Sequence, residues 1–164
     1  SVKKKFKIGI KLVRGAYIEK ENKRSLDLGV SSKICSSKTA TDKNFNAALD
    51  YILNRIKECE LFLGSHNEKS VIKVIDWMKK NNFPNNYSKI WFSQLYGMAD
   101  HISFNLASKG YQVVKYIPYG PIKEVIPYLI RRAQENSSVS SQTSRELYLI
   151  RKELKRRSIK EVEL

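Results

Sequence analysis

Cysteine, glycine and proline are all scarce in this sequence, and each scarcity excludes a class of protein. The two cysteines, Cys35 and Cys59, form no CxxC pair and have no other ligand spacing around them. This excludes a disulfide framework and a metal site, and it is typical of a reducing compartment. Seven glycines and four prolines among 164 residues exclude a fibrous or low-complexity chain.

Long hydrophobic runs are also missing. No apolar stretch approaches the ~20 residues that a membrane-spanning helix requires. Hydrophobic residues nevertheless make up 41% of the sequence and aromatic residues 10%, which is enough for the core of one folded domain. The chain begins with Ser1 and carries neither a secretory signal nor an amphipathic targeting segment, so we expect it to be part of something longer.

Acidic residues are few relative to basic ones, with 16 Asp and Glu against 31 Lys and Arg, which gives a net charge of +15. Such an excess favours an anionic partner: a nucleic acid, an acidic lipid surface or a phosphate-bearing cofactor. Much of it lies in two terminal runs, Lys3 to Lys7 and Arg151 to Lys160. Runs of this kind are most often solvated faces, so the charge alone does not choose among these partners.

Short apolar runs alternate with helical patterns, which indicates repeated βα units around a parallel sheet. We expect a polar connection from about Ser31 to Asp42 and a Ser-rich break at Ser137 to Ser144. The expected elements are strands at 8–13, 60–64, 90–94 and 113–117, helices at 44–58, about 71–80, about 102–110 and from 121, and a last amphipathic segment at about 144–155.

Polar motifs follow each expected strand. In parallel βα architectures the loops at the carboxyl ends of strands converge on ligands. We therefore expect a site there, although His66 is explained equally well as a helix cap or a core hydrogen bond. No Walker loop, dinucleotide fingerprint or Ser/His/Asp order is present. The motifs are Arg14 with Tyr17, Ser65-His66-Asn67, Ser93 to Gly97, and Tyr116 with Tyr119.

Two adjacent arginines, Arg131 and Arg132, lie on a short expected helix with Glu135. Each guanidinium can hold a carboxylate or phosphate through two parallel hydrogen bonds. Glu135 comes four residues after Arg131, so both project from the same helix face. The pair is an anion site or, on the alternative interpretation, a solvated charge cluster.

Five motifs follow one another along the chain: Lys11 to Tyr17, Ser65 to Asn67, Phe92 to Met98, Lys115 to Gly120 and Tyr128 to Asn136. In this order they closely resemble the proline dehydrogenase family, and the resemblance covers about residues 8–157. It implies the eukaryotic, mitochondrial branch, whose members oxidise proline on a distorted (βα)8 barrel. Because four βα units are present and an eight-stranded barrel needs about 250 residues, residues 1–164 are expected to form a single partial catalytic domain, strands five to eight, with a basic helical tail at about 144–164.

The resemblance also implies residue roles. Arg131 and Arg132 would hold the substrate carboxylate, with Glu135 as their orienting partner. Tyr116, Tyr128 and Leu95 would pack around the pyrrolidine ring. No catalytic residue is assigned with certainty, and no metal is expected. The positions expected near FAD are Arg14, Ser65, His66, Asn67, Ser93 and Gln94.

The activity that the resemblance implies is the oxidation of L-proline to 1-pyrroline-5-carboxylate. It further implies FAD as cofactor, quinone as electron acceptor, and a place on the matrix side of the mitochondrial inner membrane as a peripheral protein. Hydroxyproline dehydrogenase is a similar relative, but it tends to carry a smaller residue where Tyr116 stands, so proline is favoured.

The missing barrel half leaves alternatives open. The 164 residues alone are expected to bind FAD poorly and to oxidise no proline. A basic nucleic-acid-binding module would use the charge directly, but the sequence has no recognised binding motif, and we expect no nucleic-acid partner. An inactive interaction fragment is a third possibility, which the upstream reading frame would test.

Overall fold

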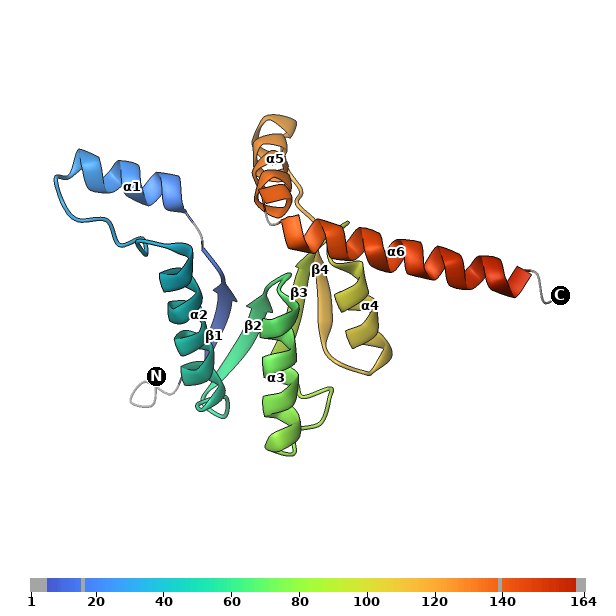
Figure 1. Cartoon of the computed structure of the whole chain (residues 1–164). Coiled ribbons are helices and arrows are strands. Elements are labelled where there is room, and N and C mark those ends of the chain that lie inside the picture. The colour runs from blue at the N-terminus through green and yellow to red at the C-terminus, as the bar shows by residue number, and fades with distance from the viewer. Residues whose placement is uncertain (1–5, 16, 139, 162–164) are drawn as a thin grey trace. The chain divides into compact units, whose positions relative to one another are not determined.

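A computed structural model describes residues 6–15, 17–138 and 140–161 of the chain, which divide into two compact units at Tyr116. The first unit holds the strands and four of the helices, and the second holds the remaining two helices (Figure 1). The elements of the first unit are β1 (Ile8–Val13), α1 (Ile18–Asp27), α2 (Lys38–Leu53), β2 (Cys59–Gly64), α3 (Glu68–Lys80), β3 (Ile90–Leu95), α4 (Asp100–Ser108) and β4 (Val113–Tyr116).

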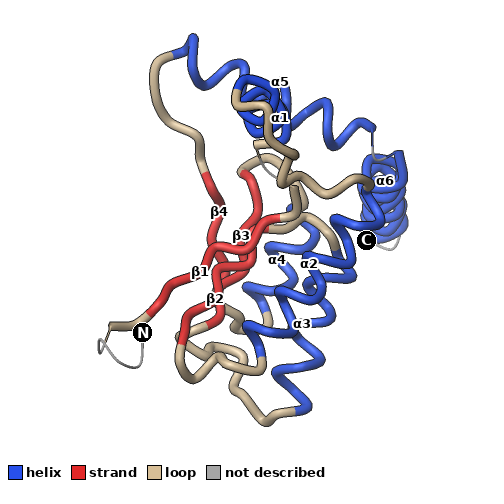
Figure 2. Tube along the Cα trace, turned by 90° about the vertical axis from the view of Figure 1, so that its left-hand side faces the viewer, coloured by secondary structure: helices blue, strands red, loops and turns tan. Residues whose placement is uncertain are grey.

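The four strands form one parallel sheet in the order β1-β2-β3-β4, as the alternation of apolar runs and helices predicts. In-register neighbours run across the sheet: Leu12 pairs with Leu63, Leu63 with Phe92 and Phe92 with Val113. Helices α2, α3 and α4 lie along one face of this sheet (Figure 2). Each strand also ends near its expected residue, and β4 stops at Tyr116 rather than at 117.

The core lies between the sheet and these three helices. Because successive side chains of a strand point to opposite faces, Leu61 and Leu63 of β2 and Ile90 and Phe92 of β3 all face the helices, and all four are almost completely buried. The helices supply the facing residues Phe45, Leu49, Leu53, Val71, Val74, Met78, Ile102 and Leu106.

Two helices differ from expectation. The sequence pattern did not predict α1, because its large apolar residues Ile18 and Leu26 are exposed and Ser25 is its buried residue, so no apolar stripe marks it. Helix α2 begins at Lys38, six residues before the expected start, and Ser37 caps it by accepting from the Ala40 N–H at 3.1 Å. Threonine and lysine residues occupy its first turns in place of apolar residues at helical spacing, so the sequence pattern did not indicate this start.

The second unit consists of α5 (Ile122–Ser138) and α6 (Ser140–Glu161). The expected Ser-rich break at 137–144 is wrong for the described residues, which are helical on both sides of residue 139, while residue 139 itself lies outside them. Pro127 stands inside α5. Among the described residues, no helix combines the length and apolar character that crossing a membrane requires.

Candidate functional site

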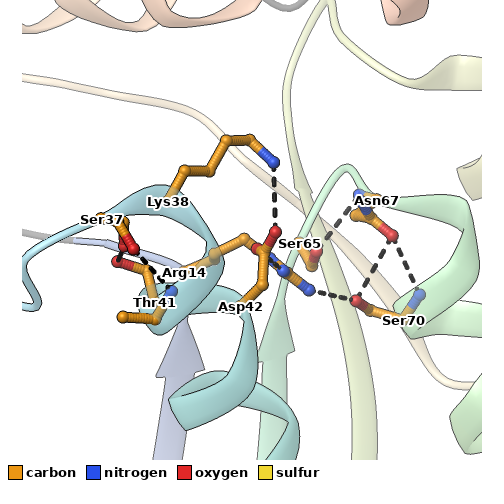
Figure 3. Close-up of polar contacts among 9 residues, drawn as sticks. Arg14, Ser37, Lys38, Thr41, Asp42, Ser65, Asn67 and Ser70 are labelled. Carbon is orange, nitrogen blue, oxygen red and sulfur yellow. Dashed lines mark hydrogen bonds and ion pairs between the residues drawn. The ribbon is translucent and has the colours of Figure 1, made fainter.

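Arg14 follows β1 and joins three elements of the first unit (Figure 3). Its guanidinium donates to the Asp42 carboxylate of α2 and to Ser70 Oγ of α3, the latter at 2.7 Å. The guanidinium carbon also lies 4.3 Å from the centroid of the Phe45 ring. Arg14, an expected cofactor contact, is therefore held by α2 and α3 on the helix-covered side of the sheet.

Asp42 is shared between two cations. Lys38 Nζ lies 3.2 Å from its Oδ2, and Arg14 binds its other oxygen. Burial raises the pKa of the Asp42 carboxyl, but the hydrogen bonds from Arg14 and Lys38 outweigh this effect, so the pKa lies below its ordinary value of 3.8. The carboxylate therefore stays ionised at neutral pH and fixes the Arg14 side chain.

Ser65 and Asn67 continue this network at the end of β2. The Asn67 N–H donates to Ser65 Oγ at 3.1 Å, and Asn67 Oδ1 accepts from the Ser70 N–H at 3.1 Å, which caps α3 (Figure 3). Ser70 Oγ, which binds Arg14, also lies 3.4 Å from Asn67 Oδ1. Arg14 and Asn67 are thus connected through Ser70, and Ser65 is connected to them through Asn67.

His66 connects the ends of β2 and β3. Its Nε2 accepts a hydrogen bond from the Leu95 backbone N–H at 3.0 Å. An imidazole nitrogen that accepts carries no proton, so this contact assigns the neutral ring with its proton on Nδ1. Of the two structural roles considered for His66, the structure therefore shows the hydrogen bond, which is part-buried and links neighbouring strand ends.

Gln94 and Ser93 point to opposite faces of β3. The Gln94 amide is buried on the helix side, where Nε2 donates to the Ser65 carbonyl at 3.2 Å and Oε1 accepts from Ser103 Oγ at 2.9 Å. The Ser93 carbonyl accepts from the Ser65 N–H at 3.1 Å. The structure places the Gln94 side chain within the core network and Ser93 on the other face.

The face opposite the helices carries a cation between two aromatic rings. Lys11 Nζ lies 5.5 Å from the Phe62 ring centroid and 5.0 Å from the Tyr116 ring centroid. Glycine at position 64 leaves room for the Val13 side chain on the same face, since a Cβ there would lie 3.0 Å from Val13 Cγ1. Leu95 pairs in register with Tyr116 and shares this face. We did not predict Lys11 as a site residue, although its strand alternation with Val13 places it on this face.

Helix α5 of the second unit carries the arginine pair. Tyr128 and Arg132, four residues apart, share a helix face, and the Arg132 guanidinium carbon lies 5.4 Å from the Tyr128 ring centroid. Arg131 is exposed and Arg132 half-buried. Glu135 lies in α5, but its side chain is outside the described residues. The predicted substrate residues thus divide into Leu95 and Tyr116 in the first unit and Tyr128, Arg131 and Arg132 in the second.

A metal site is absent from the described residues: no three of their His, Cys, Asp or Glu side chains are grouped so that they could hold an ion. What the strand ends offer instead is hydrogen-bond donors, cations and aromatic surface. This set of groups suits an anionic or aromatic organic ligand.

The fold of this chain is similar to that of solved structures named proline utilization A. Proline utilization A from Bdellovibrio bacteriovorus, inactivated by N-propargylglycine, matches 82% of this chain and 14% of its own, with a TM-score of 0.71 and 29% identity. The family model described as proline dehydrogenase matches residues 1–145. The chain belongs to the proline dehydrogenase family.

Two curated relatives show how the chain compares with complete proteins. It is 41% identical over 162 residues to mitochondrial proline dehydrogenase 1 of Dictyostelium discoideum, covering 96% of this chain and 28% of the relative. It is 42% identical over 153 residues to hydroxyproline dehydrogenase of Xenopus laevis, covering 91% of this chain and 33% of the relative. The chain therefore spans about a third or less of these relatives, and overall identity does not separate the two substrate names.

Proposed function

We propose that residues 1–164 form the carboxyl-terminal half of the catalytic domain of a flavin-dependent proline dehydrogenase. In this proposal the four βα units are strands five to eight of a distorted (βα)8 barrel, and about 144–164 form its basic helical tail. Support comes from the parallel sheet, whose outer strands β1 and β4 each pair with one neighbour, and from its helix cover on one face. Unpaired edges of a parallel sheet are favourable places for further strands.

The observation that carries the proposed substrate is the pairing of Tyr128 with Arg132 on α5, beside the exposed Arg131. Two adjacent guanidinium groups can hold one carboxylate with parallel, charge-assisted hydrogen bonds. A ring stacked against one guanidinium limits its rotamers and supplies apolar surface next to the anion site. A small cyclic amino acid has a carboxylate next to an apolar ring, so it fits an anion site with apolar surface beside it. Glu135 would orient Arg131 from the same helix.

Leu95 and Tyr116 would supply the remaining apolar walls. They are register partners at the carboxyl ends of β3 and β4, and Tyr116 is 45% exposed. In the proposed enzyme they would exclude water from the pyrrolidine ring and hold its reacting carbon in place.

The donor set at the strand ends fits FAD. Lys11 supplies a cation beside aromatic rings on the sheet face opposite α2, α3 and α4, which suits the electron-rich flavin carbonyls. Arg14 Nε is buried and has no hydrogen-bond partner among the described residues, so it is available as a donor. Arg14, Ser65, His66, Asn67, Ser93 and Gln94 would hold the cofactor directly or through the network described above. When bound, the flavin supplies the two-electron acceptor for amine oxidation.

The same proposal includes the product 1-pyrroline-5-carboxylate, transfer of electrons to quinone, and a peripheral position on the matrix side of the mitochondrial inner membrane. The location is supported by the relative named mitochondrial proline dehydrogenase 1. Proline is preferred to hydroxyproline because a phenol at Tyr116 would crowd a 4-hydroxyl group.

Fusion to the missing half tests the activity. We would express the chain alone and joined behind the segment of the Dictyostelium relative that precedes its matched region, then measure flavin absorbance and proline-dependent dye reduction. The fusion should bind flavin and reduce dye, and the chain alone should bind flavin poorly and reduce no dye. Proline-dependent dye reduction by the chain alone would contradict the half-domain proposal.

A pair of double variants in the fusion tests the arginine site. Arg131→Met with Arg132→Met should raise KM for proline by at least about a hundredfold, because each lost charge-assisted pair contributes about 1.5–3 kcal/mol. Lys79→Met with Lys80→Met is the matched control, since it removes two adjacent exposed cations from the end of α3. Equal KM values in the two double variants would remove the arginine pair from the site.

A further inference from the structure

Helix α6 carries an exposed aliphatic stripe that the dehydrogenase site does not use. Leu147, Ile150 and Leu154 are 47%, 57% and 59% exposed. They are three and four residues apart, the spacing that places side chains on one helix face. Their positions lie beyond residues 1–145, the part of the chain that the family model matches.

Cations surround this stripe. Along one border, Arg151 lies four residues after Leu147 and Lys155 four residues after Arg151; along the other, Arg157 lies seven residues after Ile150. Over the described side chains of residues 147–157, five Lys and Arg accompany one carboxylate, Glu153. Glu153 accepts from Arg156 at 2.5 and 2.7 Å and from Arg157 Nε at 3.0 Å. The ion pairs hold these arginines along the helix, and the surface retains a net positive charge.

We propose that α6 lies on the surface of an anionic lipid bilayer, with Leu147, Ile150 and Leu154 inserted at the boundary between headgroups and acyl chains. Aliphatic side chains bordered by lysine and arginine are the pattern of an interfacial helix, and each basic residue adds attraction to anionic headgroups. A nucleic acid would engage the cations but leave the aliphatic stripe in water. This inference assigns a definite surface, helix α6, to the membrane contact of the proposed function. It rests on the proposed membrane contact and not on the proposed flavin or substrate site.

Vesicle flotation of the whole chain tests this surface. Vesicles of equal parts phosphatidylcholine and phosphatidylglycerol should carry the protein, and vesicles of phosphatidylcholine alone should carry at least about tenfold less, because the attraction of the basic residues to anionic headgroups is lost. Binding should weaken with salt but persist in part, since the apolar contact is not screened. Equal binding to both vesicles, or complete loss in moderate salt, would overturn the proposal.

Substitutions separate the stripe from the charge. Leu147→Gln, Ile150→Gln and Leu154→Gln together should reduce vesicle binding at least tenfold while preserving helix propensity, because glutamine is a good helix former. The matched control is Leu26→Gln, Leu28→Gln and Val30→Gln, which removes three other exposed aliphatic residues. Unchanged binding in the α6 variant, or an equal loss in the control, would overturn the assignment.

A depth measurement does not depend on these variants remaining folded. Ile150→Trp should show fluorescence quenching by brominated phospholipids beyond that of the unmodified chain. No additional quenching would overturn insertion. Self-association that disappears in the glutamine variant, without vesicle binding by the unmodified chain, would show that the stripe is a protein interface. Because neither flavin nor proline enters these assays, their failure is distinguishable from failure of the proposed dehydrogenase.

Discussion

The ammonium of Lys11 lies 5.0 Å from the ring centroid of Tyr116, although the two residues come from opposite edges of the four-stranded sheet. Lys11 also lies near Phe62 of the intervening β2. A lysine side chain that lies beside two rings, on the sheet face opposite α2, α3 and α4 (Figure 2), contributes little to the core. Its charge is instead available to a ligand on that face.

Replacing Lys11 with methionine should therefore lower the free energy of unfolding of the isolated chain only slightly. An exposed cation–π contact contributes about 0.5–1 kcal/mol, so Lys11→Met, which removes two such contacts, should lower the free energy of unfolding by no more than about 2 kcal/mol. Lys115→Met is the comparison, because Lys115 Nζ binds the Met98 carbonyl and the Asp100 carboxylate, each at 2.6 Å, and its loss should cost about 1.5–3 kcal/mol. Urea unfolding of both variants measures the difference. A larger cost at Lys11 would make it a structural residue.

The Arg14–Asp42 pair predicts a pH dependence of stability. Because the pKa of Asp42 in the folded chain lies below its ordinary value of 3.8, the carboxylate stabilises the fold above that pH, and this contribution is lost as the pH falls through the folded pKa. Asp42→Asn should cost about 1–3 kcal/mol at neutral pH, since it leaves Arg14 partly buried beside a neutral group.

Unfolding measured from neutral pH down to below pH 3.8 should show the deficit of Asp42→Asn shrinking. Asp50→Asn serves as the control, because its partner Lys73 lies 2.7 Å away in a pair that is largely exposed, and such pairs contribute little. A deficit at Asp42 that stays constant, or grows, as the solution becomes more acidic would contradict the ionised pair.

The sequence predicted the sheet well because each strand is a short apolar run between polar stretches, and β1 was located to the residue at Ile8–Val13. It did not reveal α1, which buries Ser25 rather than an apolar stripe. The sequence also located the polar residues at the ends of the strands, but not the directions of their side chains. Strand alternation places Gln94 with Phe92 on the helix side, and Lys11 with Val13 on the other. The presence of a residue in one of the motifs does not show which face of the sheet its side chain occupies.

The excess positive charge leaves a nucleic-acid partner as the competing prediction. We expect only non-specific binding, with Kd no tighter than about 10⁻⁶–10⁻⁴ M at physiological salt. Fluorescence anisotropy with duplex and single-stranded oligonucleotides over a salt series measures it. Nanomolar binding that survives Arg131→Ala with Arg132→Ala would favour a nucleic-acid-binding module over the dehydrogenase.

The side chain at Tyr116 predicts whether the complete enzyme prefers proline or hydroxyproline as its substrate. The residue stands at the end of β4, next to its register partner Leu95, so shortening it opens space on the face where the substrate ring is proposed to lie. In the fusion with the Dictyostelium segment, Tyr116→Ser should raise the ratio of kcat/KM for hydroxyproline over proline by about 10- to 200-fold, the range that a change of one pocket group produces. Tyr51→Ser, which removes an exposed ring from the outer helix α2, should leave that ratio unchanged. A fusion that already prefers hydroxyproline with Tyr116 in place would reverse the proposed substrate.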